Sequence, residues 1–316
     1  MNAPAYILRR VIALIPLWIG ITAIAFTIGH LAPGDPGNAI LGERLGRPPT
    51  AAELHAFDHA AGLDRPVVVQ YFAWLADAAR GNLGVSYQSN ESVASILLSH
   101  LPATMLLATA ALIISAAAAL PLGVVAARHR GTPTDGALRL FSTVTSSVPN
   151  FAMGYVLIIL FAVELQLLPP QGASQPSSLI LPALTLAVPT VGIVIRLMRA
   201  SMLDVMDEDF VRTARAKGVS ERAIAYRHVL RNAFGAVLTY LGLTYAELLA
   251  GAAVVEPVFA WPGIGLVLNQ AIHQRDFPVI QGFVILAGTI FLLVNLAVDL
   301  MYLALDPRLR TEVAPA

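Results

Sequence analysis

Long apolar runs constrain this sequence more than any other feature. A helix that crosses a bilayer needs about 20 mostly apolar residues. The runs that reach this length are Val11 to Leu31, Ala103 to Ala127, Leu140 to Leu168, Leu179 to Leu197, Phe234 to Val255 and Val279 to Leu305. Several prolines lie within or beside these runs, where lipid-embedded helices tolerate them and kink. The sequence therefore predicts an all-α polytopic membrane protein with about six spans.

The composition agrees with lipid as the main solvent. Of the 316 residues, 57% are hydrophobic and 13% are charged, whereas a soluble domain carries about twice that share of charge. Lys+Arg and Asp+Glu are equal at 20 each, which argues against nucleic acid as a partner because phosphate binding needs a basic excess. Cysteine is absent, which excludes disulfides, thiolate metal sites and cysteine nucleophiles.

The N-terminal segment, residues 1–31, resembles a secretory signal at first sight because Arg9-Arg10 precedes an apolar run. That run is too long for a signal peptide and has no small-x-small cleavage site. We expect residues 1–31 to form an uncleaved signal-anchor span.

Positive charge predicts the orientation of the spans, because cytoplasmic loops are enriched in Lys and Arg. The chain has Arg9-Arg10 before the first run, and further basic residues lie in alternate loops and at the C-terminus: Arg128, Arg130, Arg139, Arg196 through Arg231, Arg308 and Arg310. Both termini of this multi-pass protein are predicted to be cytoplasmic.

Residues 32–101 form the largest expected extramembrane loop, with short amphipathic helices. Thr50 and Glu53 have the spacing of a capping box, and Gly62 is placed to end that helix. Pro66 suits the first position of a second helix. The second helix has apolar residues at spacings of three to four, namely Val68, Phe72, Leu75 and Ala79, before Gly81.

A charged segment between the fourth and fifth runs, within residues 201–232, has the chemistry of a short helix. Acidic residues begin the stretch Asp207 to Gly218 and basic residues end it, which complements the helix dipole. Gly218 can adopt the left-handed conformation that closes a last turn, and Ser220 can cap a second helix. From the residues alone, this loop either projects into the cytoplasm to meet a partner or rests on anionic lipid.

Sequence motifs favour the first of these alternatives, a loop that meets a partner in the cytoplasm. The segment resembles the loop that ABC-importer permeases use to contact their ATPases: Gly218 takes the place of its glycine, and Arg212-Thr213-Ala214 fall where that pattern has Glu-Ala-Ala. The sequence from Phe210 to Gly218, followed by that from Arg227 to Ala233, resembles the dipeptide, oligopeptide and nickel permease subfamily. Further motifs of its first-permease subunit occur in order: Pro33-Gly34-Asp35-Pro36, Leu101-Pro102-Ala103-Thr104, Pro121-Leu122-Gly123, Phe259 to Gly265, and Asp299-Leu300 with Leu305-Asp306-Pro307-Arg308.

The resemblance implies a type I ABC-importer (MetI-like) transmembrane domain. It implies a permease core over residues 102–305, a coupling loop at 201–232 and a cytoplasmic tail at 306–316. It also implies a multi-pass protein of the bacterial inner membrane, surrounded by membrane lipid, with a second homologous permease subunit, two ABC ATPase subunits that bind ATP on the cytoplasmic side, and an external substrate-binding protein. The residues it assigns to ATPase coupling are Arg212, Ala214, Arg215, Lys217 and Gly218.

No enzyme signature is found in the chain. A Walker A loop needs a lysine followed by Ser or Thr, but the single lysine, Lys217, is followed by Gly218. We therefore expect no catalytic residue and no cofactor in this chain, and any ATP-driven motor must be a separate polypeptide. His273 and Asp276 do not make a metal site, and no metal is expected.

Ionisable residues in the predicted spans are few: Glu164, Glu247 and Asp299, with His30 at a boundary. Such residues are functional candidates by default, and Glu247 is the best candidate for the substrate pathway. Trp261 is expected to anchor a re-entrant turn at the membrane interface, and the alternative for this motif is a gate or a docking point for the binding protein. Di- or oligopeptides are the first choice of substrate, nickel or a nickel chelate the second, and a stand-alone secondary transporter is the alternative from another class.

Overall fold

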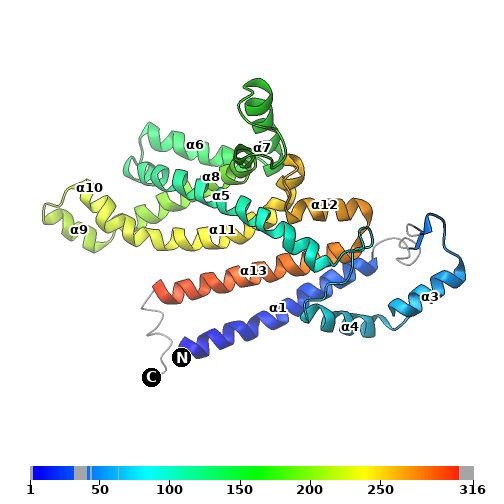
Figure 1. The fold of residues 1–316 in the computed structure, drawn as a ribbon. Helices are drawn as coiled ribbons and strands as arrows, with labels where there is room; N and C mark the ends of the chain where they lie inside the picture. Colours follow the sequence, from blue (N-terminus) through cyan, green and yellow to red (C-terminus); the bar gives the residue numbers. More distant parts are fainter. Residues whose placement is uncertain (1–2, 32–40, 43–44, 63, 306–316) are drawn as a thin grey trace. The chain divides into compact units, whose positions relative to one another are not determined.

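A computed structural model describes residues 3–31, 41–42, 45–62 and 64–305 of the chain. Helices dominate this described part, whose only β feature is an isolated bridge between Val85 and Ser92. The elements in chain order (Figure 1) are α1 (Ala3–Leu31), α3 (Ala51–Ala61), α4 (Val67–Ala79), α5 (Val93–Arg128), α6 (Pro133–Ser147), α7 (Asn150–Leu157), η1 (Ile158–Glu164), η2 (Pro176–Leu179), α8 (Ile180–Met206), α9 (Asp209–Ala216), α10 (Glu221–Ala223), η3 (Ile224–Val229), α11 (Leu230–Phe259), α12 (Ile264–Gln274) and α13 (Phe277–Leu305).

Five helical segments are long and apolar enough to cross a membrane, and a bent pair of helices raises the number to six. The five segments are Arg9–Thr27, Val93–Arg128, Pro176–Met206, Glu221–Phe259 and Phe277–Leu300. The expectation of about six spans is confirmed on this count. The predicted motifs at residues 33–36 and 306–308, and the tail at 306–316, lie outside the described residues.

The run from Leu140 to Leu168, predicted as one span, is broken. Helix α6 and the segment Asn150–Glu164 meet at an angle of 104°. Pro149 disfavours helical geometry at the residue before it, and Val148 accordingly has an extended backbone with φ −86° and ψ 127°. A kink was expected from the proline, but a bend of this size makes the pair either a broken span or a re-entrant loop.

The chain divides into two compact units. The core unit contains Leu101–Leu266 with residues 3–7 and 290–305, and the flanking unit contains Leu8–His100 with Val267–Thr289.

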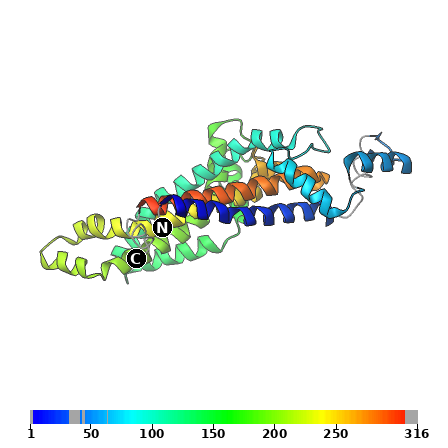
Figure 2. The ribbon, with the colours of Figure 1, turned by 90° about the horizontal axis from the view of Figure 1, so that it is seen from below.

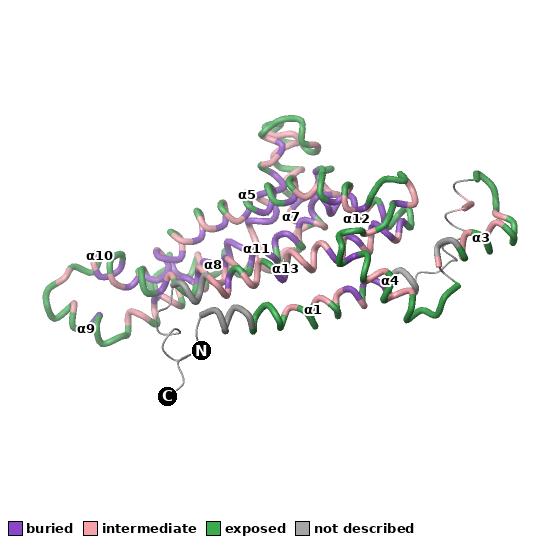
Figure 3. Tube along the Cα trace, turned by 60° about the horizontal axis from the view of Figure 1, so that its bottom comes forward, coloured by how far each residue is buried: buried purple, intermediate pink, exposed green. Residues whose placement is uncertain are grey.

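In the core unit, α8 is the central helix and packs against α6 and α11. Figure 2 shows these elements from a second direction, and Figure 3 shows the buried residues concentrated along α5, α8 and α11. Close approach of α6 to α8 depends on Gly192, because a Cβ there would collide with Thr145 and Ser142. A buried ion pair adds to this contact: the Arg199 guanidinium donates to both carboxylate oxygens of Asp135 at 2.6 and 2.9 Å.

In the flanking unit, the predicted capping box of α3 is confirmed. The Thr50 hydroxyl accepts a hydrogen bond from Glu53 N, and the Glu53 carboxylate accepts one from Thr50 N. Gly62 ends the helix with φ 68°. Helix α4 begins one residue later than predicted, because Pro66 is its N-cap rather than its first residue. The buried side of α4 is not the predicted apolar face. Ala78 is buried and Trp74 packs beside it, whereas Val68 and Phe72 of the predicted face are exposed.

Candidate functional site

Helix α9 and its C-terminal turn form the predicted coupling loop. The helix is shorter than expected, because Asp207 ends α8 and Glu208 is the N-cap of α9. Gly218 has φ +77°, as its role in closing the helix requires. The Gly218 N–H donates to Arg215 O and the Val219 N–H donates to Ala214 O, which together make a Schellman motif.

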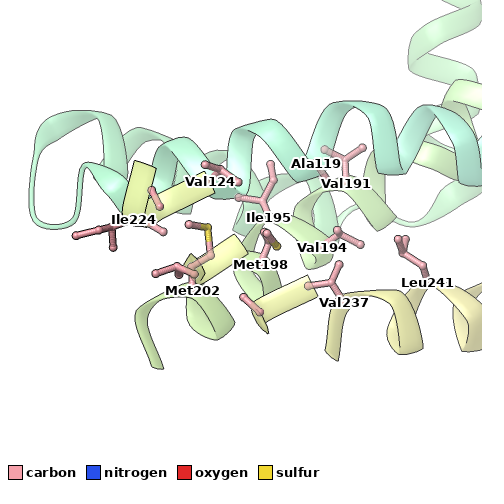
Figure 4. Close-up of a cluster of buried hydrophobic side chains, with 14 of the residues drawn as sticks. Ala119, Val124, Val191, Val194, Ile195, Met198, Met202, Ile224, Val237 and Leu241 are labelled. Carbon is pink, nitrogen blue, oxygen red and sulfur yellow. The ribbon is translucent and has the colours of Figure 1, made fainter. Parts of the chain in front are cut away.

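The inner face of α9 is part of the hydrophobic core. Val211 is fully buried, and Ala214 and Val219 pack at the edge of the same cluster. Figure 4 shows the neighbouring members of that cluster converging from α5, α8, η3 and α11: Ala119, Val124, Val191, Val194, Ile195, Met198, Met202, Ile224, Val237 and Leu241. Since one continuous apolar cluster contains residues of α9 and of three long helices, a displacement of α9 must disturb the packing of those helices.

The outer face of α9 carries charge. Arg212, Arg215 and Lys217 are all exposed. Arg212 Nη1 lies 3.2 Å from Asp209 Oδ1, whereas Arg215 Nε lies 2.7 Å from Glu221 Oε1. The second bond joins α9 to α10, and it raises the pKa of the Arg215 guanidinium above its usual value.

Four of the five predicted coupling residues therefore lie on or beside the exposed surface of one hairpin, and the fifth, Ala214, faces inward. Ser220 caps α10 as predicted, accepting a bond from Ala223 N. Figures 1 and 2 show α9 and α10 as a hairpin at one end of the core unit. Gly218 stands in open space, so its requirement is the backbone conformation and not close packing.

Sequence reasoning missed two features of this hairpin. Phe210 is a large apolar side chain beside the arginines and is 43% exposed. A pocket of about 360 Å³ lies between the ends of α5 and α8 and the hairpin, and among its lining residues are Arg128, Arg130 and Arg215. The guanidinium carbon of Arg128 stands 5.6 Å from the centre of the Tyr226 ring. Sequence did not separate Phe210 from Val211, because both are apolar neighbours and only the structure shows which of them is buried.

A second polar site, also missed, lies where α11 turns into α12. Glu256 is fully buried. Its carboxylate accepts bonds from Thr104 Oγ1 at 2.6 Å, Gly265 N at 2.6 Å and Leu266 N at 3.2 Å. A carboxylate at the first turn of α12 also suits the dipole of that helix.

Close contacts around Glu256 explain the glycines of the turn. A Cβ at Gly263 would collide with the carboxylate, and one at Gly265 would collide with Ala253. Trp261 was expected to anchor this turn at the membrane interface, but it is only 5% exposed and its indole N–H donates to Ala103 O at 3.0 Å. Trp261 thus joins α5 to the turn from inside the core, because its polar group finds a protein partner.

Glu247, the predicted pathway residue, lies on α11 nine residues before Glu256 and is exposed. The structure does not bring it near the coupling loop: Glu247 lies in the middle of α11, and α9 joins the core near the start of that helix.

Comparison with known proteins gives the family. Residues 119–311 match the family described as binding-protein-dependent transport system inner membrane component, and residues 4–108 match the N-terminal family of such membrane components. The di/tripeptide transport system permease protein DppB of Pseudomonas aeruginosa is 38% identical, with 98% of this chain and 99% of the relative covered. The glutathione transport system permease protein GsiC of Escherichia coli is 37% identical, with 96% and 98% covered.

A solved structure shares the fold. The MetNI methionine ABC transporter, in inward-facing conformations, matches with a TM-score of 0.58 and 18% identity over 67% of this chain and 96% of that chain. At this identity the match supports the MetI-like fold alone. The chain therefore belongs to the binding-protein-dependent transport system inner membrane components, as a multi-pass permease of an ABC importer.

Proposed function

We propose that this chain is a permease subunit for di- or oligopeptides. The two named relatives support this choice, since one is named for di- and tripeptides and the other for glutathione, itself a tripeptide. Both cover nearly the whole chain. These names favour peptides over nickel or a nickel chelate.

The motor of transport is proposed to be a separate ATPase that receives α9. The observation that carries this proposal is the division of α9 into two faces, with Val211 fully buried in the core and Arg212 exposed. Such a helix can transmit a movement of the bound ATPase to the membrane spans. The sequence supports a separate motor, because Lys217 is the single lysine and Gly218 follows it, which is incompatible with a Walker A loop. ATP would thus be bound by the partner subunits, and this chain would need no cofactor.

The proposed assembly contains this chain, a second homologous permease subunit, two ATPase subunits and an external binding protein. Both termini would be cytoplasmic, with residues 1–31 as an anchor, 32–101 on the external side of the membrane, and 201–232 and 306–316 on the cytoplasmic side. Glu247 is proposed to line the substrate path, which its exposed position on α11 permits. Exposed Arg212 and Lys217 would contact acidic groups of the ATPase, while Arg215 holds α9 to α10 through Glu221.

Replacement of Gly218 tests the coupling proposal. A β-branched residue is strained at φ +77°, so Gly218→Val should distort the hairpin, and the assembled transporter should lose ATP-driven peptide uptake and ATPase co-purification while still inserting in the membrane. Gly172 is a matched control, because it has φ +90° in open space; Gly172→Val should keep the ATPase bound. Peptide uptake by vesicles that contain no ATPase subunit would instead indicate a secondary transporter.

A further inference from the structure

Helix α4 has an apolar surface that no other described element covers. Val67, Val68, Val69 and Phe72 are 56%, 65%, 47% and 61% exposed. Four large apolar side chains exposed on a 13-residue helix are a costly surface to place in water. The position of α4 along α1 indicates what surrounds it.

An adjacent side of α4, with Tyr71, Trp74 and Ala78, packs on α1. The Tyr71 hydroxyl donates to Ile19 O at 3.3 Å and also lies 3.1 Å from Thr22 Oγ1. The Phe26 ring is 5.4 Å from the Tyr71 ring and 5.6 Å from the Trp74 ring, measured between centroids. Ala78 continues this contact in a small cluster with Ala25 and Ile285.

These contacts on α1 all lie between Ile19 and Phe26, within the apolar segment Arg9–Thr27 that is long enough to span the membrane. Helix α4 therefore lies beside the membrane-spanning part of α1 and not beyond its end. Figures 1 and 3 show α4 along the C-terminal half of α1 in this unit.

The exposed surface of α1 at the same level is apolar too. Ile15, Ile19 and Ile24 are 55%, 43% and 60% exposed, as expected of a span that faces lipid. The exposed side of α4 continues this surface, because the Tyr71 contact holds the two helices together at Ile19. We infer that α4 is a lipid-embedded helix, with Val68 and Phe72 among the acyl chains of the leaflet that surrounds the C-terminal half of α1.

The polar groups of α4 fit this placement. Asp77 is nine residues after Val68, about 180° around the helix, and pairs with Arg80 at 3.6 Å. Gln70 donates its amide to Arg65 O at 2.8 Å. The first-turn N–H groups of Val69 and Gln70 both donate to Pro66 O. Tyr71 and Trp74 are the residue types that gather at the boundary between acyl chains and headgroups.

Site-directed spin labelling can test this inference, because the chain has no cysteine. Val68→Cys and Phe72→Cys are the test positions, and Asp77→Cys, on the opposite face, is the matched control. Each labelled variant is assembled with cysteine-free partner subunits in vesicles of phosphatidylethanolamine and phosphatidylglycerol, and ATP-driven uptake confirms the assembly. Collision rates with oxygen, which concentrates in lipid, and with a water-soluble nickel chelate are then measured.

At Val68→Cys and Phe72→Cys we expect the ratio of oxygen to nickel collisions to exceed that at Asp77→Cys severalfold. A ratio equal to the control would place this face in water and overturn the inference. Low collision rates with both reagents would also overturn it, because they would show that a second subunit or an external protein covers α4.

Discussion

At one end of the core unit α9 is held by apolar packing around Val211, whereas at the other end the turn from α11 to α12 is held by hydrogen bonds to the buried carboxylate of Glu256. Apolar contacts are non-directional and survive small shifts, while hydrogen bonds weaken steeply when their geometry is lost. Since α11 runs from one end to the other, we expect α9 to be able to change its seating while the Glu256 end stays fixed. The α9 end of the core unit is therefore suited to movement, and the Glu256 end is suited to rigidity.

Glu256→Ala would break the rigid end and should have the largest effect. The substitution leaves Thr104 Oγ1, Gly265 N and Leu266 N without their acceptor, and buried groups left unpaired cost about 1–3 kcal/mol each. We expect the free energy of unfolding to fall by about 3 kcal/mol or more, seen as a lower thermal midpoint in lipid nanodiscs.

Glu247→Ala is the matched control on the same helix. Its side chain is exposed, so the midpoint should stay within experimental error, while peptide uptake falls if Glu247 lines the path. Equal midpoints for Glu256→Ala and Glu247→Ala would show that the buried carboxylate does not fix this end.

Val211→Asp tests the apolar end. A carboxylate is unstable in the fully buried position of Val211, so α9 should leave its seat. We expect substrate-stimulated ATPase activity of the assembled transporter to fall at least tenfold, with a smaller loss of thermal stability than Glu256→Ala because the hairpin is at the end of the core. Ala216→Asp, on the exposed side of the same helix, should retain most of the activity; the same loss in both variants would point to surface charge and not to packing.

Glu221→Gln sharpens the comparison by removing only the surface bond of the hairpin. Exposed ion pairs contribute about 0.2–1 kcal/mol, and the Arg215 and Glu221 side chains are 43% and 69% exposed. ATP-driven uptake should therefore decrease less than in Val211→Asp. A double-mutant cycle with Arg215→Gln measures the coupling, and a loss as large as that of Val211→Asp would mean that the ion pair, and not the core, seats α9.

Glu53 offers an exposed counterpart to Glu256, since both carboxylates bind the first turn of a helix. The bond from Arg47 lowers the pKa of Glu53 from 4.5 to about 2. A lowered pKa in the folded state means that the carboxylate stabilises α3 above pH 4.5 and that this contribution disappears as the pH falls toward 2. Hydrogen-exchange protection of α3, corrected for intrinsic rates, should be greater than in Glu53→Gln at pH 5, and the difference should shrink at pH 3. A difference that does not vary with pH would exclude the carboxylate as its cause.

Local chemistry made much of the fold predictable. The capping box of Thr50 and Glu53, the closing turn at Gly218 and the cap at Ser220 depend on residues within a few positions of each other, and all three are confirmed. Long apolar runs likewise predicted the spans, because lipid leaves few alternatives to helix.

Long-range contacts were not predictable in the same way. Glu256 follows directly on the apolar run that ends at Val255, and its partner Thr104 is 152 residues earlier, so no local pattern joins them. Trp261 was assigned to the interface because an aromatic residue beside Pro262 looks the same in sequence whether its indole binds water or Ala103 O. The buried Asp135 to Arg199 pair was missed for the same reason.

Cross-linking at Lys217 tests the central claim, that α9 meets the ATPase, most directly. Lys217→Cys in the assembled transporter, treated with a short bifunctional maleimide and an ATPase that carries one surface cysteine in its permease-facing groove, should give a covalent dimer whose yield changes with nucleotide. Ser174→Cys is the control, because this exposed position precedes α8 whereas α9 follows it, and a helix of 27 residues separates the two by about 40 Å. No product at Lys217, or equal products at both positions, would contradict the account.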